Sequence, residues 1–223
     1  MQTSPLTISS NRGLTLIVRE LIAFGANIEF RNYESRTALI IASGEGHVGV
    51  VKELIRCRAD VNVYDRGNWT ALMLTVNSQN KPDDREKIVK MLVVAGANLN
   101  ARNHLNLTAL LCATHNNMGK VIAYLLREGA DDSVMDYNGE TAFQVAVRQN
   151  RPYAVQDAWD EMKGRMNESK VDTVLLSAVV ANNTLEVEDE APLAAFLREV
   201  PNAMIMMEGI MSFLIGPMDP RFL

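Results

Sequence analysis

Residues 37–60 read TALIIASGEGHVGVVKELIRCRAD, and this stretch decides the fold. Two short apolar runs, residues 39–42 and 50–55, lie on either side of a polar turn. Apolar residues at spacings of three and four predict two short amphipathic helices. The hydroxyl of Thr37 is expected to cap the first helix by accepting a hydrogen bond from a free backbone N–H.

The two ends of this stretch recur along the chain, in phase with each other. Thr-Ala-Leu stands at 37, 70 and 108 and Thr-Ala-Phe at 141, so the spacings are 33, 38 and 33 residues. A second marker, Gly-Ala-Asn or a close variant, begins at 25, 58, 96 and 129 with the same spacings. Its glycine is expected to close the second helix in a left-handed conformation. Ser-Pro-Leu at residue 4 extends the pattern backwards, and the five units start near Ser4, Thr37, Thr70, Thr108 and Thr141.

This pattern resembles the ankyrin repeat, a unit of 33 residues with a turn or β-hairpin followed by two antiparallel helices. The resemblance extends from Ser4 to about Glu161. It implies an all-α ankyrin-repeat solenoid with projecting turns, and a helical C-terminal cap. We therefore expect five repeats in residues 1–162, followed by a degenerate sixth repeat or cap and an apolar C-terminal helix in residues 163–223.

The chain departs from the family pattern in two respects. The usual opening Thr-Pro-Leu-His is replaced by Thr-Ala-Leu followed by Ile, Met or Leu, and by Thr-Ala-Phe-Gln. The histidine that links units by a hydrogen bond is missing, and apolar packing is expected in its place, with a less rigid array as the result. The third unit carries an insertion around residues 80–85, whose Pro and Asp predict an exposed turn and a new helix start.

The last quarter of the chain contains no clean repeat. Residues 175–180 and 192–200 would form the two helices of a degenerate capping unit. Residues 203–218 are apolar and predict one further helix, with three roles open: packing against the cap, binding a partner, or associating with a membrane. This run is shorter than the ~20 residues of a membrane-spanning helix and contains Glu208, so membrane insertion is not expected.

Composition and charge narrow the classes of function. Of the 223 residues, 48% are hydrophobic and 22% charged, which excludes wholesale disorder. The formal net charge of −5 gives no bulk attraction to nucleic acid, and no nucleic acid partner is expected. Two cysteines, Cys57 and Cys112, are too few for a disulfide scaffold. The first residues lack the pattern of a secretory signal, so a cytoplasmic location is expected.

The sequence offers little for catalysis. Cys112 and His115 would share a helix face, but no third ligand is evident nearby, so no metal site is predicted. The chain has no Gly-rich phosphate-binding pattern and no Gly-x-Ser-x-Gly elbow. The acidic run at 186–190 lacks the ligand spacing of a Ca²⁺ loop. We predict no catalytic residue and no cofactor.

The resemblance places a protein-binding surface on the turn tips and on the inner face of the first helices. In the family, the turn tips correspond to the residues one, three and four positions before each Thr of this sequence. Glu45 lies on the expected first helix of the second unit. Hot spots favour Trp, Tyr and Arg. For Trp69 and Leu107 the alternative is packing against neighbouring turns. The candidate partner-binding residues are Tyr33, Glu34, Arg36, Glu45, Arg66, Trp69, His104, Leu105, Leu107, Tyr137, Asn138 and Glu140.

The resemblance implies a non-enzymatic interaction module that binds another protein through its ankyrin groove as an adaptor, scaffold or inhibitor. A monomer is expected. The alternative is a targeting protein whose repeats select the target, while its C-terminal segment recruits a second machine or anchors to an assembly or membrane. The remaining hypothesis, an enzymatic activity, rests only on the absence of a recognised pattern in the C-terminal segment.

Overall fold

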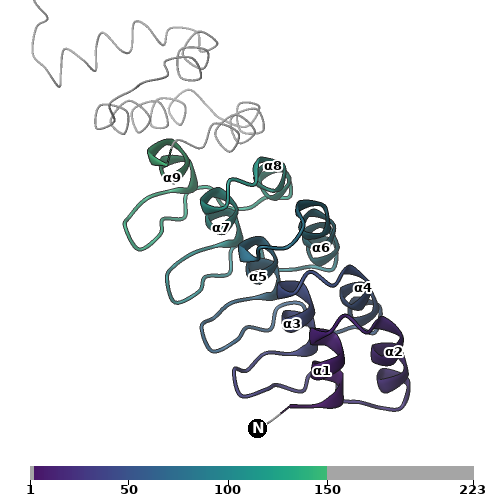
Figure 1. Ribbon diagram of the computed structural model, residues 1–223. Coiled ribbons are helices and arrows are strands. Elements are labelled where there is room, and N and C mark those ends of the chain that lie inside the picture. The colour runs from purple at the N-terminus through teal and green to yellow at the C-terminus, as the bar shows by residue number, and fades with distance from the viewer. Residues whose placement is uncertain (1–2, 150–223) are drawn as a thin grey trace, which may run out of the picture. The chain divides into compact units, whose positions relative to one another are not determined.

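The computed structural model describes residues 3–149 of the 223-residue chain. Within this part, short helices follow one another in pairs (Figure 1). The prediction of helical repeats is confirmed for these residues. The predicted cap and C-terminal helix, residues 163–223, lie outside them. The helices are α1 (Pro5–Asn11), α2 (Thr15–Ala23), α3 (Ala38–Gly44), α4 (Val48–Arg56), α5 (Ala71–Asn77), α6 (Pro82–Val94), α7 (Ala109–His115), α8 (Gly119–Arg127) and α9 (Ala142–Arg148).

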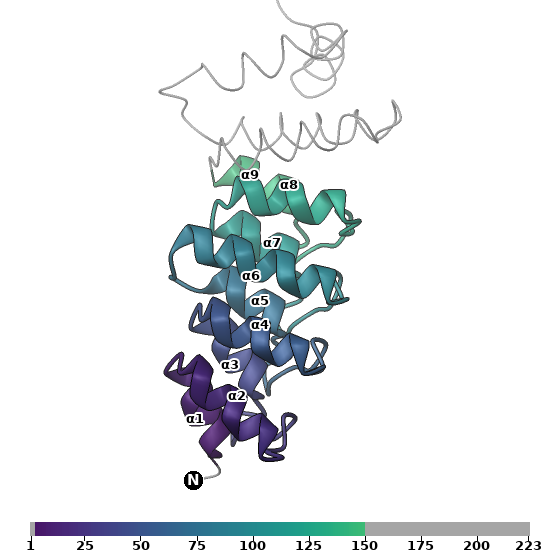
Figure 2. The same cartoon turned by 90° about the vertical axis from the view of Figure 1, so that its right-hand side faces the viewer.

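The helices stack in two rows. The first helices of the units, α1, α3, α5, α7 and α9, contact one another in sequence, and α2, α4, α6 and α8 form the second row (Figures 1 and 2). The core lies between the rows and between successive pairs. Its largest fully buried side chains recur at equivalent positions of the units and include Leu39, Leu72 and Leu110 in the first row, and Leu54, Leu92 and Leu125 in the second.

The predicted N-caps are present in every unit. The side-chain oxygens of Ser4, Thr37, Thr70, Thr108 and Thr141 each accept a hydrogen bond from the backbone N–H three residues later, at 3.1–3.4 Å. In the last unit the cap is reciprocal, because Gln144 Oε1 accepts from the N–H of Thr141 at 2.8 Å. Each cap satisfies a donor that the helix itself leaves unpaired.

Apolar side chains replace the family's linking histidine, as expected. Ile40, Met73 and Leu111 occupy its position and are each 1% exposed. The third unit accommodates its insertion as one extra helical turn, because α6 has 13 residues where α4 and α8 have nine. Pro82 is its first residue and acidic side chains occupy its first turn, which suits the positive end of the helix dipole.

Side-chain acceptors link each unit to the next at the far end of the second helices. Glu29 Oε1 accepts from the N–H of Asp60 at 2.9 Å. Asn62 Oδ1 and Asn100 Oδ1 accept in the same way from the N–H groups of Asn98 and Asp131, at 2.7 and 2.9 Å. These acceptors stand at equivalent positions, so the polar ladder repeats with the same period as the core.

A buried ion pair joins the second helices of the first two units. Glu53 on α4 has a side chain only 6% exposed and binds Arg56 Nη2 at 2.6 Å and Arg19 Nε of α2 at 3.1 Å. The hydrogen bond from Arg56, then that from Arg19, hold the pKa of Glu53 below its usual range. The carboxylate is therefore charged in the folded chain at neutral pH and contributes to the α2–α4 contact.

Each of the four second helices within residues 3–149 is followed by a left-handed residue, which is glycine in three of them. Gly25, Gly96 and Gly129 have φ of 84°, 89° and 94°, as predicted. In the second unit Arg58 takes this place with φ of 63°. A side chain in this conformation costs about 1–2 kcal/mol. The second unit thus carries a local strain that its neighbours avoid.

Replacing Arg58 with Gly should raise the free energy of unfolding by about 0.5–1 kcal/mol. The expected gain is a difference of two terms. Glycine relieves a backbone strain of about 1–2 kcal/mol, and its greater chain entropy in the unfolded state costs about 0.5–1 kcal/mol. Urea denaturation measures the difference. Arg58→Ala keeps the Cβ atom and should give no gain, whereas Gly96→Ala should lose about 1 kcal/mol. Equal stability of the Gly and Ala variants at position 58 would contradict the assignment of strain.

Glu53→Gln should reduce stability more at pH 7 than at pH 3. Because folding lowers the pKa of Glu53, its stabilising contribution is present above the usual carboxyl pKa and disappears as pH falls through the folded value. Urea denaturation of both proteins at the two pH values provides the test. Glu20→Gln, at an exposed position on α2, is the matched control. A stability difference at Glu53 that is the same at pH 3 and pH 7 would rule out the ionic contribution.

Candidate protein-binding surface

Four loops project from the same side of the first-helix row, each joining one unit to the next (Figure 1). Each is closed by a backbone hydrogen bond between the residues five and one positions before the Thr, as from Asp65 N–H to Trp69 C=O at 3.0 Å. The predicted β-hairpins are short: within residues 3–149, isolated antiparallel bridges pair Tyr64 with Thr70 and Met135 with Thr141. The loops are therefore tight hairpin turns and not extended ribbons.

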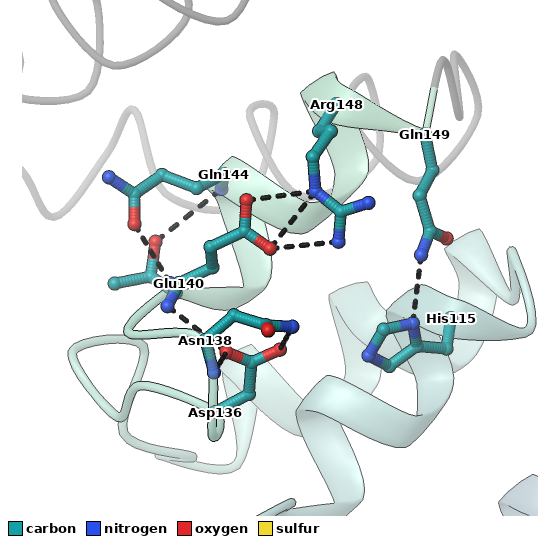
Figure 3. Close-up of polar contacts among 8 residues, drawn as sticks. His115, Asp136, Asn138, Glu140, Gln144, Arg148 and Gln149 are labelled. Carbon is teal, nitrogen blue, oxygen red and sulfur yellow. Dashed lines mark hydrogen bonds and ion pairs between the residues drawn. The ribbon is translucent and has the colours of Figure 1, made fainter.

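An Asn or Asp side chain holds each loop from within. Asn32, Asp65, Asn103 and Asp136 accept with Oδ1 from the N–H groups two and four residues later, at 2.8–3.1 Å. Figure 3 shows this arrangement for Asp136. These four residues are not among the predicted site residues. Their sequence signal is the Asn or Asp that stands five residues before each Thr. Such side chains stabilise turns by bonding the backbone ahead of them.

Backbone bonds also fix neighbouring loops to one another. The N–H of Arg66 donates to the C=O of Glu34 at 3.0 Å, and the N–H of His104 donates to the C=O of Gly67 at 3.1 Å. These bonds connect the same two positions in successive loops. These bonds hold the tips of the first three loops in register, and a side-chain bond from Asn106 Nδ2 to the C=O of Met135 at 2.6 Å links the third loop to the fourth.

The outermost row lies four residues before each Thr and consists of predicted site residues. Tyr33 is 56% and Tyr137 69% exposed, and Arg66 and His104 are also exposed. We call these four residues the tip row. Leu105, next to His104, is 51% exposed. Large aromatic and cationic side chains are thus presented to solvent on a backbone that is bonded in place.

Beside the first loop, the surface is hollowed by about 350 Å³. The lining includes four predicted residues, Tyr33, Glu34, Arg36 and Glu45, together with Leu74 and Asn77 of α5. We call this feature the inner hollow. Its lining combines acidic, cationic and aromatic side chains with the apolar side chains of Ile41 and Leu74, a mixture typical of protein-binding surfaces.

The Arg36 side chain forms ion pairs that stabilise the loops. Its guanidinium binds Glu34 Oε2 at 2.9 Å and Asp65 Oδ2 at 3.0 Å. Asp65 is 5% exposed, so the second bond joins two loops through a buried carboxylate. Arg36 lines the inner hollow and at the same time holds its wall.

Two predicted residues, Leu107 and Trp69, are not fully exposed. Leu107 is 9% exposed, so packing, the alternative considered above, describes its side chain and it is not part of the exposed surface. Trp69 is half-buried, and its ring lies against Gly67, where an added Cβ would approach it to 2.8 Å. Spacing alone could not distinguish these from the fully exposed tip residues, because all of them occupy loop positions.

At the last described loop, the predicted residues Asn138 and Glu140 lie around Asp136 (Figure 3). Glu140 makes a bidentate ion pair with Arg148 of α9, with the three N–O distances between 2.8 and 3.0 Å. The pKa of Arg148 is raised by its hydrogen bond with Glu140. On the neighbouring inner face, Gln149 and His115 Nδ1 lie 3.0 Å apart in a hydrogen bond between the fourth and fifth units.

The cysteine and histidine side chains in the described part of the chain were also candidates for metal binding. No group of three or more His, Cys, Asp or Glu side chains converges within residues 3–149 in a way that would hold a metal ion. Cys112 is 2% exposed, and burial raises the pKa of its thiol to about 12, so it stays protonated at neutral pH. His47 bonds through Nε2 with the C=O of Asn11 in the preceding unit at 2.9 Å. None of the helices in this part of the chain is sufficiently long and apolar to traverse a bilayer.

Comparison with known proteins agrees with this architecture. The family model described as ankyrin repeats (3 copies) matches residues 6–103 and 81–156, which is more than half of the chain. The chain belongs to the ankyrin repeat family.

Relatives share the repeat region over part of their length. The chain is 31% identical over 145 residues to an L-asparaginase of Dirofilaria immitis, covering 64% of this chain and 23% of that protein. It is 28% identical over 188 residues to the ankyrin repeat and KH domain-containing protein mask-1 of Caenorhabditis elegans, covering 84% of this chain and 7% of the relative. Over 70 residues it is 43% identical to a putative ankyrin repeat protein of Acanthamoeba polyphaga mimivirus. The chain spans less than a quarter of the length of each of these three relatives.

Asp65→Ala should lower the free energy of unfolding by about 2 kcal/mol, because it leaves two loop N–H groups and the Arg36 guanidinium without their buried acceptor. Asp65→Asn keeps the Oδ1 acceptor of the loop N–H groups but replaces Oδ2, the acceptor of Arg36 Nε, with an NH2 donor, so its loss should be smaller. Thermal and urea denaturation compare the two variants. Losses of the same size would show that the Oδ1 bonds within the loop do not contribute.

Proposed function

We propose that this chain is a non-enzymatic protein-binding module whose partner docks on the tip row and the inner hollow. Members of the ankyrin repeat family are known as protein–protein interaction modules, which supports binding in general. The observation that carries the more specific proposal is the tip row itself: Tyr33, Arg66, His104 and Tyr137 are all exposed at the same loop position. Tyr and Arg dominate the energetics of protein interfaces.

Three features of this surface favour tight binding. The loop backbones are fixed by internal Asx bonds and by bonds between loops, so little order has to be gained when a partner docks. Tyrosine provides a large contact area with few rotatable bonds. The inner hollow adds a concave site next to the tip of the first loop, where a partner side chain could be buried.

The names of two relatives include an enzyme activity, L-asparaginase and glycerophosphocholine phosphodiesterase, but the match covers 23% and 8% of those proteins. We assign the matching region of these two relatives to their ankyrin repeats, and we do not infer a catalytic activity of this chain from their names. The mask-1 relative and the B-cell lymphoma 3 protein homolog of Mus musculus support an interaction role without naming a partner. Adaptor, scaffold and inhibitor are forms of this same role.

The proposal includes a monomer and a cytosolic location, and the free thiols of Cys57 and Cys112 support the location. The alternative role, in which residues 163–223 recruit a second machine or anchor the chain, depends on a segment outside the described residues. It therefore remains a prediction of the sequence.

The test compares partners captured by the full chain, by a variant of the tip row and by a control variant at exposed positions away from it. Tyr33→Ala, Arg66→Ala and Tyr137→Ala together remove three of the four side chains of the tip row without touching the Asp65 contacts, and should lower partner affinity at least about tenfold. Arg36 and Trp69 are left intact because both contribute to loop structure. Quantitative mass spectrometry identifies the captured proteins, and titration with the purified partner measures the affinity.

Phe24→Ala with Val94→Ala serves as the control, since these side chains are 87% and 84% exposed at the ends of the second helices. This variant should bind the partner as the parent does. Unchanged binding by the folded triple variant, or an equal loss in the control, would refute the proposed surface. Circular dichroism and the unfolding midpoint establish that each variant is folded.

A further inference from the structure

The inner hollow is lined by more negative than positive charge. Among the described residues around it, the charged side chains are those of Glu34, Arg36 and Glu45. Glu45 directly follows α3 and is exposed. Its carboxylate forms no ion pair and no hydrogen bond with any other residue in the described part of the chain. The hollow is therefore lined by a negative charge that has no partner within residues 3–149.

Arg36 does not balance this charge. Its guanidinium binds Glu34 Oε2 at 2.9 Å and Asp65 Oδ2 at 3.0 Å, so one cation is shared between two carboxylates. With Glu45 there are three carboxylates and one guanidinium, and the formal net charge of this group is −2. A chemical group that enters the hollow therefore meets a negative potential, which favours a cation.

The rest of the lining suits a long side chain with a flat cationic end. Ile41 and Leu74 are half-buried and supply apolar surface for a methylene stem. The Tyr33 ring is 56% exposed and offers an aromatic face to a cation. The amides of Asn11 and Asn77, both exposed, add carbonyl oxygens that accept hydrogen bonds.

The size of the hollow limits what it can hold. Its volume of about 350 Å³ is at the low end of the range for ligand sites, about 300–1,000 Å³. This volume suits a single side chain and not a folded element of the partner.

We propose that the inner hollow receives an arginine side chain of the partner protein. The guanidinium pairs with Glu45 and Glu34 and lies against the Tyr33 ring. The methylene stem lies on Ile41 and Leu74. The proposal rests on the function proposed above, because it names the chemistry of the partner at one part of the same surface.

Other side chains fit the hollow less well. An acidic or phosphorylated side chain would be repelled by the glutamates. An apolar side chain would displace water from the Glu45 carboxylate without pairing with it, and that loss of hydration is costly. Lysine would supply the charge, but its compact ammonium has three donors and no plane to stack on a ring, whereas arginine has five donors on a plane.

The probe is the tripeptide Gly-Arg-Gly with blocked ends, titrated into the full chain and followed by NMR. The methyl signals of Ile41 and Leu74 and the amide signals of Tyr33 and Glu45 should shift and reach saturation. Gly-Gln-Gly and Gly-Glu-Gly should bind at least about fivefold more weakly, because they lack the ion pairs. Gly-Lys-Gly should bind with an affinity between those of Gly-Arg-Gly and Gly-Gln-Gly.

Glu45→Gln should lower the affinity for Gly-Arg-Gly about threefold, as expected for one exposed ion pair. Glu20→Gln, the same change at an exposed position on α2, is the matched control and should leave the affinity unchanged. The proposal would be overturned by the absence of shifts at the hollow, or by equal binding of Gly-Gln-Gly or Gly-Lys-Gly. An affinity that Glu45→Gln does not change, or that both variants lower equally, would also overturn it.

This experiment fails separately from the test of the tip row. Arg66→Ala with Tyr137→Ala leaves the lining of the hollow intact and should bind Gly-Arg-Gly as the parent does. If Gly-Arg-Gly does not bind but the triple tip-row variant loses its partner, the docking surface stands and the assignment of arginine is wrong. If Gly-Arg-Gly binds through Glu45 while the triple variant keeps its partner, the assignment stands and the tip row is not the docking surface.

Discussion

The structure depends on the burial of apolar side chains between successive helix pairs. A pair of helices of seven and nine residues is too short to be stable alone, because helices of this length are marginal in water without tertiary packing. The leucines at 54, 92 and 125 are fully buried, and each of their helices packs against the second helix of the preceding pair. Stability is then a sum of units and interfaces, as in other stacked repeats.

The stacked helices fix the positions of the loops, because each loop is attached to helices at both of its ends. The N-caps and the left-handed residues fix where each helix starts and ends, and the Asx side chains shape the loop between them. Neighbouring loops are then close enough for backbone bonds, and Arg36 reaches across to Asp65. The tip row is therefore a consequence of core packing: equal unit lengths bring equivalent loop positions into line. The insertion in the third unit preserves this alignment because it lengthens α6 and leaves the loops unchanged.

The sequence predicted the fold well because the fold is periodic. Two markers with the same spacings located all five N-caps and the insertion. The surface was predicted less completely. Leu107 and Tyr137 both occupy loop positions, yet one is buried and the other exposed, since burial depends on contacts with the next unit that spacing does not reveal. Arg58 in a left-handed conformation and the pairing of Arg36 with a buried carboxylate likewise arise from three-dimensional neighbours.

Native-state hydrogen exchange tests most directly whether the stack holds the loops in a fixed arrangement for binding. The amide hydrogens of Gly67, Trp69, Leu105 and Leu107 donate to Asp65 and Asn103 in the loops. If the account is correct, they exchange slowly, and Val50→Ala in the core weakens their protection together with that of the α4 and α5 helices. Exchange at the rate of an unstructured peptide, independent of the core substitution, would contradict the claim that packing of the helix pairs preorganises the binding surface.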